Sequence, residues 1–145
     1  MTTRILFVCL GNICRSPAAE GVFRSMAPEC QIDSAGTGNW HVGDPPYPAM
    51  QAAALARGHD LSTQRARQFH AGDFDAFDII VAMDNDNLRA IEAQRPAGNT
   101  TPVRLFMDFA PDAGADRVPD PYYTGDFDEA LDLIEQAARG LRAAL

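Results

Sequence analysis

Short apolar runs alternate along the chain with longer segments in which apolar residues recur at helical spacing. The runs 5–8 and 79–82 have the length and composition of buried strands, and the runs 31–35 and 103–106 are predicted as a short second and a fourth strand. Strands that alternate with helices in this way are typical of a parallel sheet covered by helices. The pattern therefore predicts an α/β fold with helices on both faces of the sheet. Because the sequence contains no internal repeat or linker, we expect residues 1–145 to form a single domain.

Several residues mark where the predicted helices begin and end. Ser16 is followed by a proline, a pair typical of an N-cap and a first helical residue, and Pro28 ends that helix. Asp84 is placed to cap a helix after the third strand, and Asp126 and Glu129 have the spacing of a capping box. The capping box opens the last predicted helix. One apolar face of this helix comprises Phe127, Ala130, Leu131, Ile134, Ala137, Ala138, Leu141 and Leu145.

Composition narrows the classes of function. With 46% hydrophobic residues the chain can bury a core without disulfides or a structural metal. Its net charge of −8 argues against binding to nucleic acid or to an anionic membrane surface. No apolar run has the length of a secretion signal or a membrane span, so we expect a cytoplasmic protein, with export by another route left open. Because the cytoplasm is reducing, we expect its thiols to be free. We also expect a monomer without a bound metal ion.

The segment Cys9-Leu10-Gly11-Asn12-Ile13-Cys14-Arg15-Ser16 joins the first predicted strand to the first predicted helix. Open α/β sheets bind their ligands at such junctions, where a helix start offers unpaired N–H groups and a positive dipole end. A loop in front of the helix can aim successive N–H groups at an anion, and Gly11 and Asn12 tolerate the left-handed backbone that this requires. Residues 10–15 are therefore a candidate phosphate-binding loop.

Within this loop Cys9, Arg15 and Ser16 form a candidate catalytic set. A helix N-terminus and a nearby cation stabilise a thiolate, which makes Cys9 the candidate nucleophile. The planar fork of Arg15 can hold two phosphoryl oxygens, and Ser16 can donate a hydrogen bond to the sulfur as it departs. The alternative interpretation, a buried small Cys9 and a solvated Arg15, does not explain why both lie at a strand-to-helix junction.

A second candidate motif lies in the irregular stretch 108–124. Transfer of a phosphoryl group to sulfur leaves an oxygen that needs a proton, so an acid must face the leaving group. Asp120 is the candidate, because the proline that follows it disfavours helical geometry there. Tyr122 and Tyr123 can form an aromatic wall beside an aromatic leaving group. The alternative is an ordinary surface turn.

Together these motifs resemble the low-molecular-weight protein tyrosine phosphatase family. The resemblance covers the whole chain and rests on four segments. They are the loop near residue 10, Ser34-Ala35-Gly36-Thr37, Met83-Asp84 with Asn87, and Asp120-Pro121-Tyr122-Tyr123. The candidate acid lies downstream of the cysteine, whereas in the larger tyrosine phosphatases it lies upstream and a histidine precedes the cysteine. Here Val8 precedes it.

The resemblance implies a four-stranded parallel sheet and a two-step hydrolysis of phosphotyrosine without metal or cofactor. Cys9 would form a phosphocysteine while Asp120 protonates the tyrosyl oxygen, and Asp120 would then activate water. The expected partners are a tyrosine-phosphorylated protein and the released phosphate ion. The resemblance also implies that Asn12 is hydrogen-bonded with Ser34. It further implies that Trp40, Tyr122 and Tyr123 line the entrance, and that a branched apolar residue at Ile13 favours tyrosine, where threonine marks relatives that act on phosphoarginine.

Cys14 lies inside the same loop and is a candidate redox partner. We hypothesise that oxidation joins Cys9 to Cys14 in a disulfide that protects the nucleophile. The alternative is that Cys14 only packs beneath the loop.

Three other functions compete. An arsenate reductase would need further cysteines after the third strand, and residues 70–110 contain none. A phosphoarginine phosphatase shares the predicted fold and differs at Ile13. A non-catalytic phosphotyrosine-binding module would be expected to lack Cys9 or Asp120, and both are present.

Overall fold

A computed structural model describes residues 2–145 and contains a four-stranded parallel sheet, as predicted. Its strands are β1 (Arg4–Cys9), β2 (Gln31–Gly36), β3 (Ile79–Ala82) and β4 (Val103–Leu105). The fourth strand is one residue shorter than predicted, because Phe106 begins a 3₁₀ helix. The strand order is β2-β1-β3-β4. After β1 the chain forms β2 on one side of it, and then crosses over to form β3 and β4 on the other side. The carboxyl end of β1, where Cys9 lies, is therefore the point at which this sheet reverses direction.

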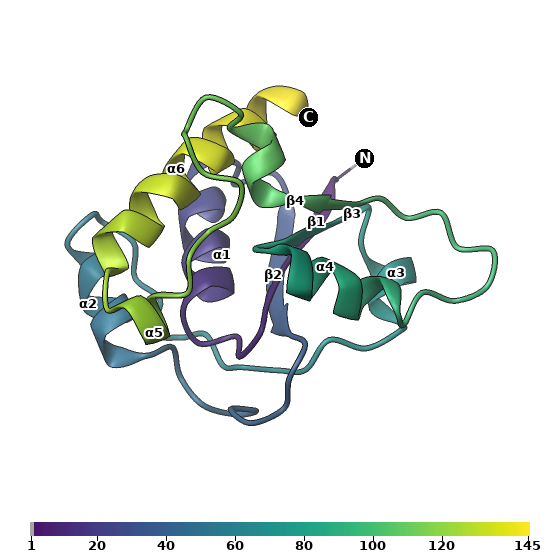
Figure 1. The fold of residues 1–145 in the computed structure, drawn as a ribbon, viewed down its shortest axis with the longest axis horizontal. Coiled ribbons are helices and arrows are strands. Elements are labelled where there is room, and N and C mark those ends of the chain that lie inside the picture. The colour runs from purple at the N-terminus through teal and green to yellow at the C-terminus, as the bar shows by residue number, and fades with distance from the viewer. Residues whose placement is uncertain (1) are drawn as a thin grey trace.

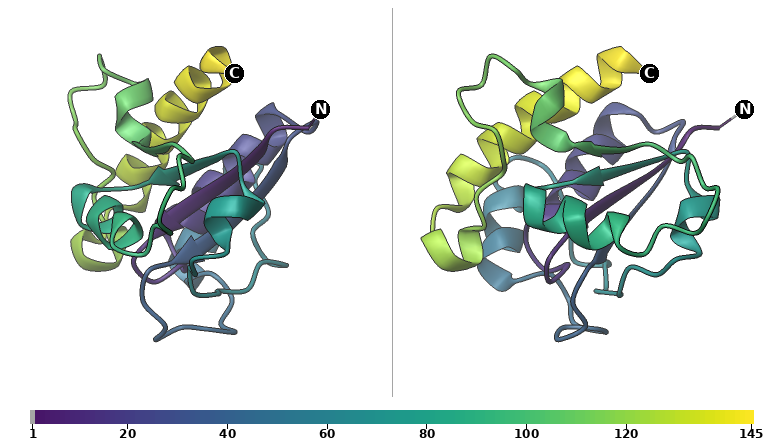
Figure 2. Two further views of the ribbon diagram at one scale, coloured as in Figure 1. Left: turned by 90° about the vertical axis from the view of Figure 1, so that its right-hand side faces the viewer. Right: turned by 45° about the vertical axis from the view of Figure 1, so that its right-hand side comes forward.

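Helices cover both faces of the sheet (Figure 1). On one face α1, α2 and α6 pack against the sheet with the 3₁₀ helix η1, and on the other face lie α3 and α4. The helices are α1 (Arg15–Met26), α2 (Pro48–Leu55), α3 (Asp73–Ala76), α4 (Asn85–Glu92), η1 (Phe106–Phe109), α5 (Pro121–Thr124) and α6 (Phe127–Ala144). The C-terminal end of α6 and the start of β1 lie at one end of the molecule, away from the loop that follows Cys9 (Figure 2).

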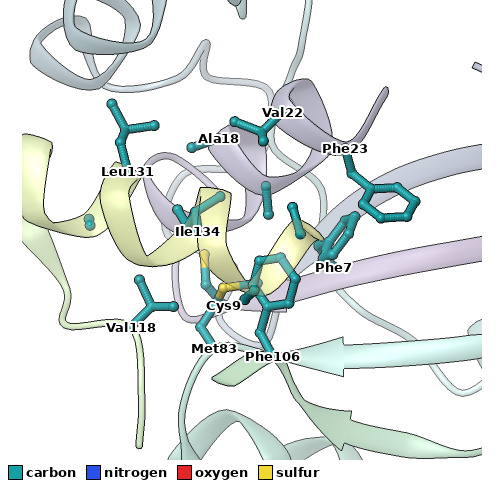
Figure 3. Close-up of a cluster of buried hydrophobic side chains, with 14 of the residues drawn as sticks. Phe7, Cys9, Ala18, Val22, Phe23, Met83, Phe106, Val118, Leu131 and Ile134 are labelled. Atoms are coloured by element: carbon teal, nitrogen blue, oxygen red, sulfur yellow. The ribbon is translucent and has the colours of Figure 1, made fainter. Parts of the chain in front are cut away.

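The central strand β1 divides the core into two clusters. Phe7 and Cys9 point to the α1 and α6 side, and Leu6 and Val8 point to the α3 and α4 side, because side chains alternate along a strand. In the first cluster the ring of Phe7 lies 5.8 Å from that of Phe23 and 5.2 Å from that of Phe106 (Figure 3). This packing on both faces fixes the position of the strand that ends at Cys9.

The helix starts confirm some of the predicted caps and correct others. Asp84 caps α4, with its carboxylate accepting from the N–H of Asn87 at 2.8 Å. Asp126 caps α6 by accepting from the N–H of Glu129 at 2.9 Å, but the N–H of Asp126 donates to Thr124 instead of to Glu129. The prediction that Ser16 caps the first helix is wrong. The helix begins at Arg15, and the Ser16 hydroxyl turns inward to Cys9.

The stretch 108–124 contains the short helix α5, which the sequence did not predict. The N–H of Val118 donates to the carbonyl of Met83 at 3.0 Å, and this bond ties the stretch to the end of β3. It brings Asp120, the N-cap of α5, to the carboxyl edge of the sheet. None of the helices in the described part of the chain is both long and apolar enough to cross a membrane.

Glu20 is a carboxylate buried between α1 and β2, with only 6% of its surface exposed. Ser34 Oγ donates to it at 2.6 Å and Arg24 Nη2 at 2.7 Å. Burial raises the pKa of Glu20, although the bonds from Ser34 and Arg24 lower it in part. The folded protein therefore holds this proton more tightly than the unfolded chain does.

The glycine in the middle of α6 is required by packing. A Cβ on Gly140 would overlap the backbone carbonyl of Phe109 in η1. We expect Gly140→Ala to lower the free energy of unfolding by about 1–3 kcal/mol, although alanine is the better helix former. Urea denaturation measures this loss, and Arg139→Ala on the exposed side of the same turn is the control. Equal stability of wild type and Gly140→Ala would contradict the close packing of α6 on η1.

The buried Glu20 makes stability depend on pH. Its charged form opposes folding at neutral pH, and this cost is lost as the pH falls through the raised pKa toward and below the ordinary value of 4.5. We therefore expect the free energy of unfolding of wild type, minus that of Glu20→Gln, to rise as the pH is lowered from 7 to 4. Urea denaturation of both proteins across this range measures the difference. A difference that stays flat or falls would show that the carboxylate is not desolvated.

Candidate active site

The loop from residue 10 to residue 15 curls at the carboxyl end of β1 with one strained residue. Asn12 has a φ of 56°, the one positive φ at a non-glycine residue in the described part of the chain. Gly11 does not adopt this conformation, contrary to the expectation from sequence. A Cβ at Gly11 would lie 3.2 Å from the ring of His41, which would have to shift by a few tenths of an ångström. Gly36 at the end of β2 is needed for space, since its Cβ would lie 2.8 Å from the Leu10 carbonyl oxygen.

Hydrogen bonds converge on the Cys9 sulfur. The backbone N–H of Asn12 donates to Sγ at 3.3 Å, and Ser16 Oγ lies 2.9 Å from it. Asn12 Nδ2 donates to Ser16 Oγ at 2.8 Å, so the Ser16 proton is available for the sulfur or for the Ala35 carbonyl, which is farther away at 3.4 Å. The surroundings of the sulfur thus offer donors, as a thiolate requires.

The Asn12 side chain connects the loop to three other segments. Besides Ser16 it donates to Ser34 Oγ at 3.0 Å, the contact implied by the family resemblance. Its Oδ1 accepts from the backbone N–H of Arg67 at 3.0 Å. The Ser34 hydroxyl donates a hydrogen bond to Glu20, so an unbroken chain of hydrogen bonds runs from the carboxylate in α1 to the sulfur.

Arg15 is buried beside two carboxylates. Its Nη1 donates to Asp84 Oδ2 at 2.7 Å and to the Val118 carbonyl at 3.0 Å, while Nη2 reaches Asp120 Oδ2 at 3.4 Å. Burial lowers the pKa of Arg15, but Cys9, Asp84 and Asp120 together outweigh burial and raise it. The guanidinium therefore stays charged at the base of the site.

Asp120 combines two contacts through different oxygens. Its Oδ1 accepts from the N–H of Tyr122 at 3.1 Å and caps α5, while Oδ2 meets Arg15. The backbone at Asp120 is extended, as the proline after it predicts. The bond to Arg15 is the longest of the three that the guanidinium makes with its partners, so it is the one most easily exchanged for a ligand.

The predicted residues meet in one cavity of about 240 Å³. Cys9, Arg15 and Asp120 all line it, and Trp40 and Tyr123, which are 71% and 75% exposed, stand at its mouth. Asn12, Ser16 and Ser34 lie behind the loop and support it. The full lining consists of Cys9, Leu10, Gly11, Ile13, Cys14, Arg15, Trp40, His41, Asp120, Tyr122 and Tyr123. The lining thus combines the sulfur of Cys9, the guanidinium of Arg15 and the carboxylate of Asp120 with the aromatic rings of Trp40, Tyr122 and Tyr123.

Cys14 also faces this cavity but differs chemically from Cys9. It is 3% exposed and stands at the N-cap of α1. Burial, together with Cys9 and Asp120, raises the pKa of Cys14 to about 12, and Arg15 only partly opposes this. The Cys14 thiol is therefore protonated at neutral pH.

Some residues of the site were missed by sequence reasoning. Asp84 was interpreted only as a helix cap, and it performs that role with Oδ1 while Oδ2 holds Arg15. Glu20 and the Val118 carbonyl carried no sequence signal, because their partners lie far away in the chain. Within residues 2–145 no three His, Cys, Asp or Glu side chains are arranged to hold a metal ion.

Comparison with known proteins identifies the family and the fold of the chain. Residues 4–145 match the family described as low molecular weight phosphotyrosine protein phosphatase. A low molecular weight protein-tyrosine-phosphatase of Bacillus subtilis, YfkJ, is 40% identical over 97% of this chain and 94% of its own. The crystal structure of YfkJ covers 99% of this chain and 94% of its own with a TM-score of 0.94. A Drosophila arginine phosphatase also shares the fold, with a TM-score of 0.89 and 30% identity over 97% of this chain and 96% of its own.

The family match extends over nearly the whole chain. The protein belongs to the low-molecular-weight protein tyrosine phosphatase family and is a phosphoric monoester hydrolase.

Proposed function

We propose that the protein hydrolyses phosphotyrosine in proteins through a phosphocysteine formed on Cys9. The observation that carries the proposal is the shared cavity, which Cys9, Arg15 and Asp120 line from three separate segments of the chain. A nucleophile, a cation for the phosphoryl oxygens and an acid for the leaving group are the parts that the reaction needs. Arg15 and Asp120 are the arginine and the carboxylate among the residues that line this cavity, and His41 is the one further lining residue with a basic side chain.

In the first step the Cys9 thiolate attacks phosphorus and the bond from phosphorus to the tyrosyl oxygen breaks. The N–H groups of the loop and Arg15 hold the phosphoryl oxygens. Arg15 Nη2 exchanges its 3.4 Å contact with Asp120 for one of these oxygens, while Nη1 stays on Asp84 and Val118. Asp120, parted from Arg15, takes up a proton from solvent when the substrate binds and gives that proton to the leaving oxygen.

In the second step water attacks the phosphocysteine and the bond from phosphorus to sulfur breaks. Asp120, now a carboxylate, takes a proton from that water as phosphate forms. Ser16, 2.9 Å from the sulfur, donates a hydrogen bond as negative charge returns to it. The Asn12 N–H at 3.3 Å adds a second donor. These two contacts make the thiolate a better leaving group.

The walls of the cavity favour tyrosine as the phosphorylated residue. Trp40, Tyr122 and Tyr123 offer aromatic surface to a phenyl ring, and Ile13 provides an apolar floor beside it. Phosphoarginine is the competing substrate, because an arginine phosphatase has the same fold. The guanidinium of phosphoarginine would need a hydrogen-bonding side chain beside it, and the Ile13 side chain has no polar group.

Substitution of the two reacting groups tests the mechanism. We expect Cys9→Ser to lose more than about ten-thousandfold in kcat on p-nitrophenyl phosphate, since removal of a nucleophile abolishes the covalent step. Asp120→Ala should lose about a hundredfold to ten-thousandfold, the usual contribution of general acid catalysis. Steady-state kinetics measure both, with Asp112→Asn in a distant exposed loop as the control. An active Cys9→Ser enzyme would refute the covalent mechanism.

The same assays on a phosphotyrosyl peptide and on phosphoarginine decide the substrate. A higher kcat/KM for phosphoarginine would replace the proposed substrate and leave the proposed mechanism in place.

We also propose that Cys14 protects the nucleophile against oxidation. Peroxide converts the Cys9 thiolate to a sulfenic acid, and the Cys14 thiol then displaces hydroxide from that sulfur to form the disulfide and water. After a peroxide pulse, thiol treatment should restore less activity in Cys14→Ser than in wild type, because the sulfenic acid proceeds to irreversible states. Activity recovery measures this, with Cys30→Ser as the control. Equal recovery in wild type and Cys14→Ser would contradict the protective role.

A further inference from the structure

A second cleft adjoins the active-site cavity. It has a volume of about 260 Å³ and shares Ile13, His41 and Tyr122 with that cavity, so these side chains have one face toward each. Its remaining walls are Asp44, Tyr47 and three prolines. The proposed reaction uses none of these added residues.

The cleft is preformed because its walls are bonded to the phosphate-binding loop and to neighbouring segments. The N–H of Tyr47 donates to the Ile13 carbonyl at 2.8 Å, so the cleft is joined directly to the loop. Ala66 N–H donates to the Asp44 carbonyl, also at 2.8 Å. The Tyr47 ring stacks on Phe127 at 5.9 Å and meets the edge of Tyr122 at 5.4 Å. A ligand would therefore bind without the cost of ordering these walls.

The chemistry of the walls points to one kind of side chain. Tyrosine and proline surfaces accept a long apolar stem or a flat cation, and tyrosine faces attract arginine in particular. Asp44 is the single carboxylate in the lining, and its side chain is 57% exposed. One of its oxygens, Oδ2, lies 3.2 Å from His41 Nδ1. With a net charge of −8 on the whole chain, an acidic ligand side chain is disfavoured and a basic one is attracted.

We propose that this cleft binds an arginine side chain that flanks the phosphotyrosine in the substrate. This inference rests on the proposed function. The arginine stem lies on Tyr47 and the prolines, and its guanidinium pairs with Asp44. Ile13 and Tyr122 line both cavities, so the cleft lies next to the proposed phosphotyrosine site. An extended peptide advances roughly 3.3–3.6 Å per residue, so we expect the arginine one or two positions from the phosphotyrosine. Asp44 and Tyr47 would then be specificity-determining residues.

Phosphotyrosyl peptides with one arginine test the proposal. The arginine is moved through the two positions on each side of the phosphotyrosine, with alanine elsewhere, and kcat/KM is compared with the all-alanine peptide. We expect one position to give an increase of roughly fivefold, the size of a partly exposed ion pair with added stacking. In Asp44→Asn this ratio should fall below about twofold, and in Asp44→Lys glutamate should be preferred over arginine at that position.

Controls separate this proposal from the function on which it rests. Asp112→Asn removes the same charge from a distant exposed loop and should keep the wild-type arginine ratio. Each ratio is taken within one variant, so a general loss of activity does not affect it. If the enzyme hydrolyses p-nitrophenyl phosphate and the peptides but prefers arginine at none of the four positions, the cleft proposal alone is overturned. A preference that persists unchanged in Asp44→Asn would overturn it too, because it would place the arginine elsewhere. Failure to hydrolyse p-nitrophenyl phosphate and every peptide would overturn the proposed function and the cleft proposal with it.

Discussion

The left-handed backbone of Asn12 is the constraint on which the site depends. A residue in this conformation is unfavourable by about 1–2 kcal/mol, and asparagine tolerates it better than most residues. Here the conformation is maintained by four hydrogen bonds, to Cys9, Ser16, Ser34 and Arg67. Because these partners belong to four different places in the chain, the loop takes this shape only when the surrounding sheet and helices are assembled.

This anchoring allows an acidic protein to offer a site for an acidic ligand. The global charge of −8 repels a phosphate group, so the attraction must be local. In the proposed reaction it comes from the start of α1, from the N–H groups of the loop and from the buried Arg15. Asp84 and the Val118 carbonyl accept hydrogen bonds from Arg15 Nη1, and Asp120 holds the Nη2 contact that we propose a phosphoryl oxygen replaces. Without a ligand, the positive charge of Arg15 is thus paired with the carboxylates of Asp84 and Asp120.

Two cavities lie side by side and share three lining residues, Ile13, His41 and Tyr122. The first contains Cys9 and Arg15 and is the proposed site of the phosphorylated tyrosine. The second is lined by Tyr47, prolines and Asp44 and is the proposed site of the flanking arginine. The hydrogen bond from the Tyr47 N–H to the Ile13 carbonyl joins the wall of the second cavity to the loop of the first.

Local sequence determined much of this protein. The apolar runs predicted β1 and β3, since a strand buried on both faces is apolar almost throughout, and the shorter runs 31–35 and 103–106 predicted the two outer strands. Asp84 and Asp126 predicted the starts of α4 and α6, because a cap acts on N–H groups only two or three residues away. The motifs around Cys9 and Asp120 pointed to the residues that line the cavity, because their chemistry can be recognised from spacing and residue type.

The tertiary structure decided what depends on residues far apart in sequence. Ser16 is shaped to cap a helix but bonds to Cys9, because the buried sulfur and Asn12 compete successfully for its hydroxyl. Asp84 became a partner of Arg15, 69 positions away, only because β1 and β3 are neighbours in the sheet. The buried Glu20 and the cleft beside Asp44 arise in the same way. Capping, periodicity and turn chemistry act over a few residues, whereas hydrogen bonds and cavities of this kind exist only after distant segments have packed together.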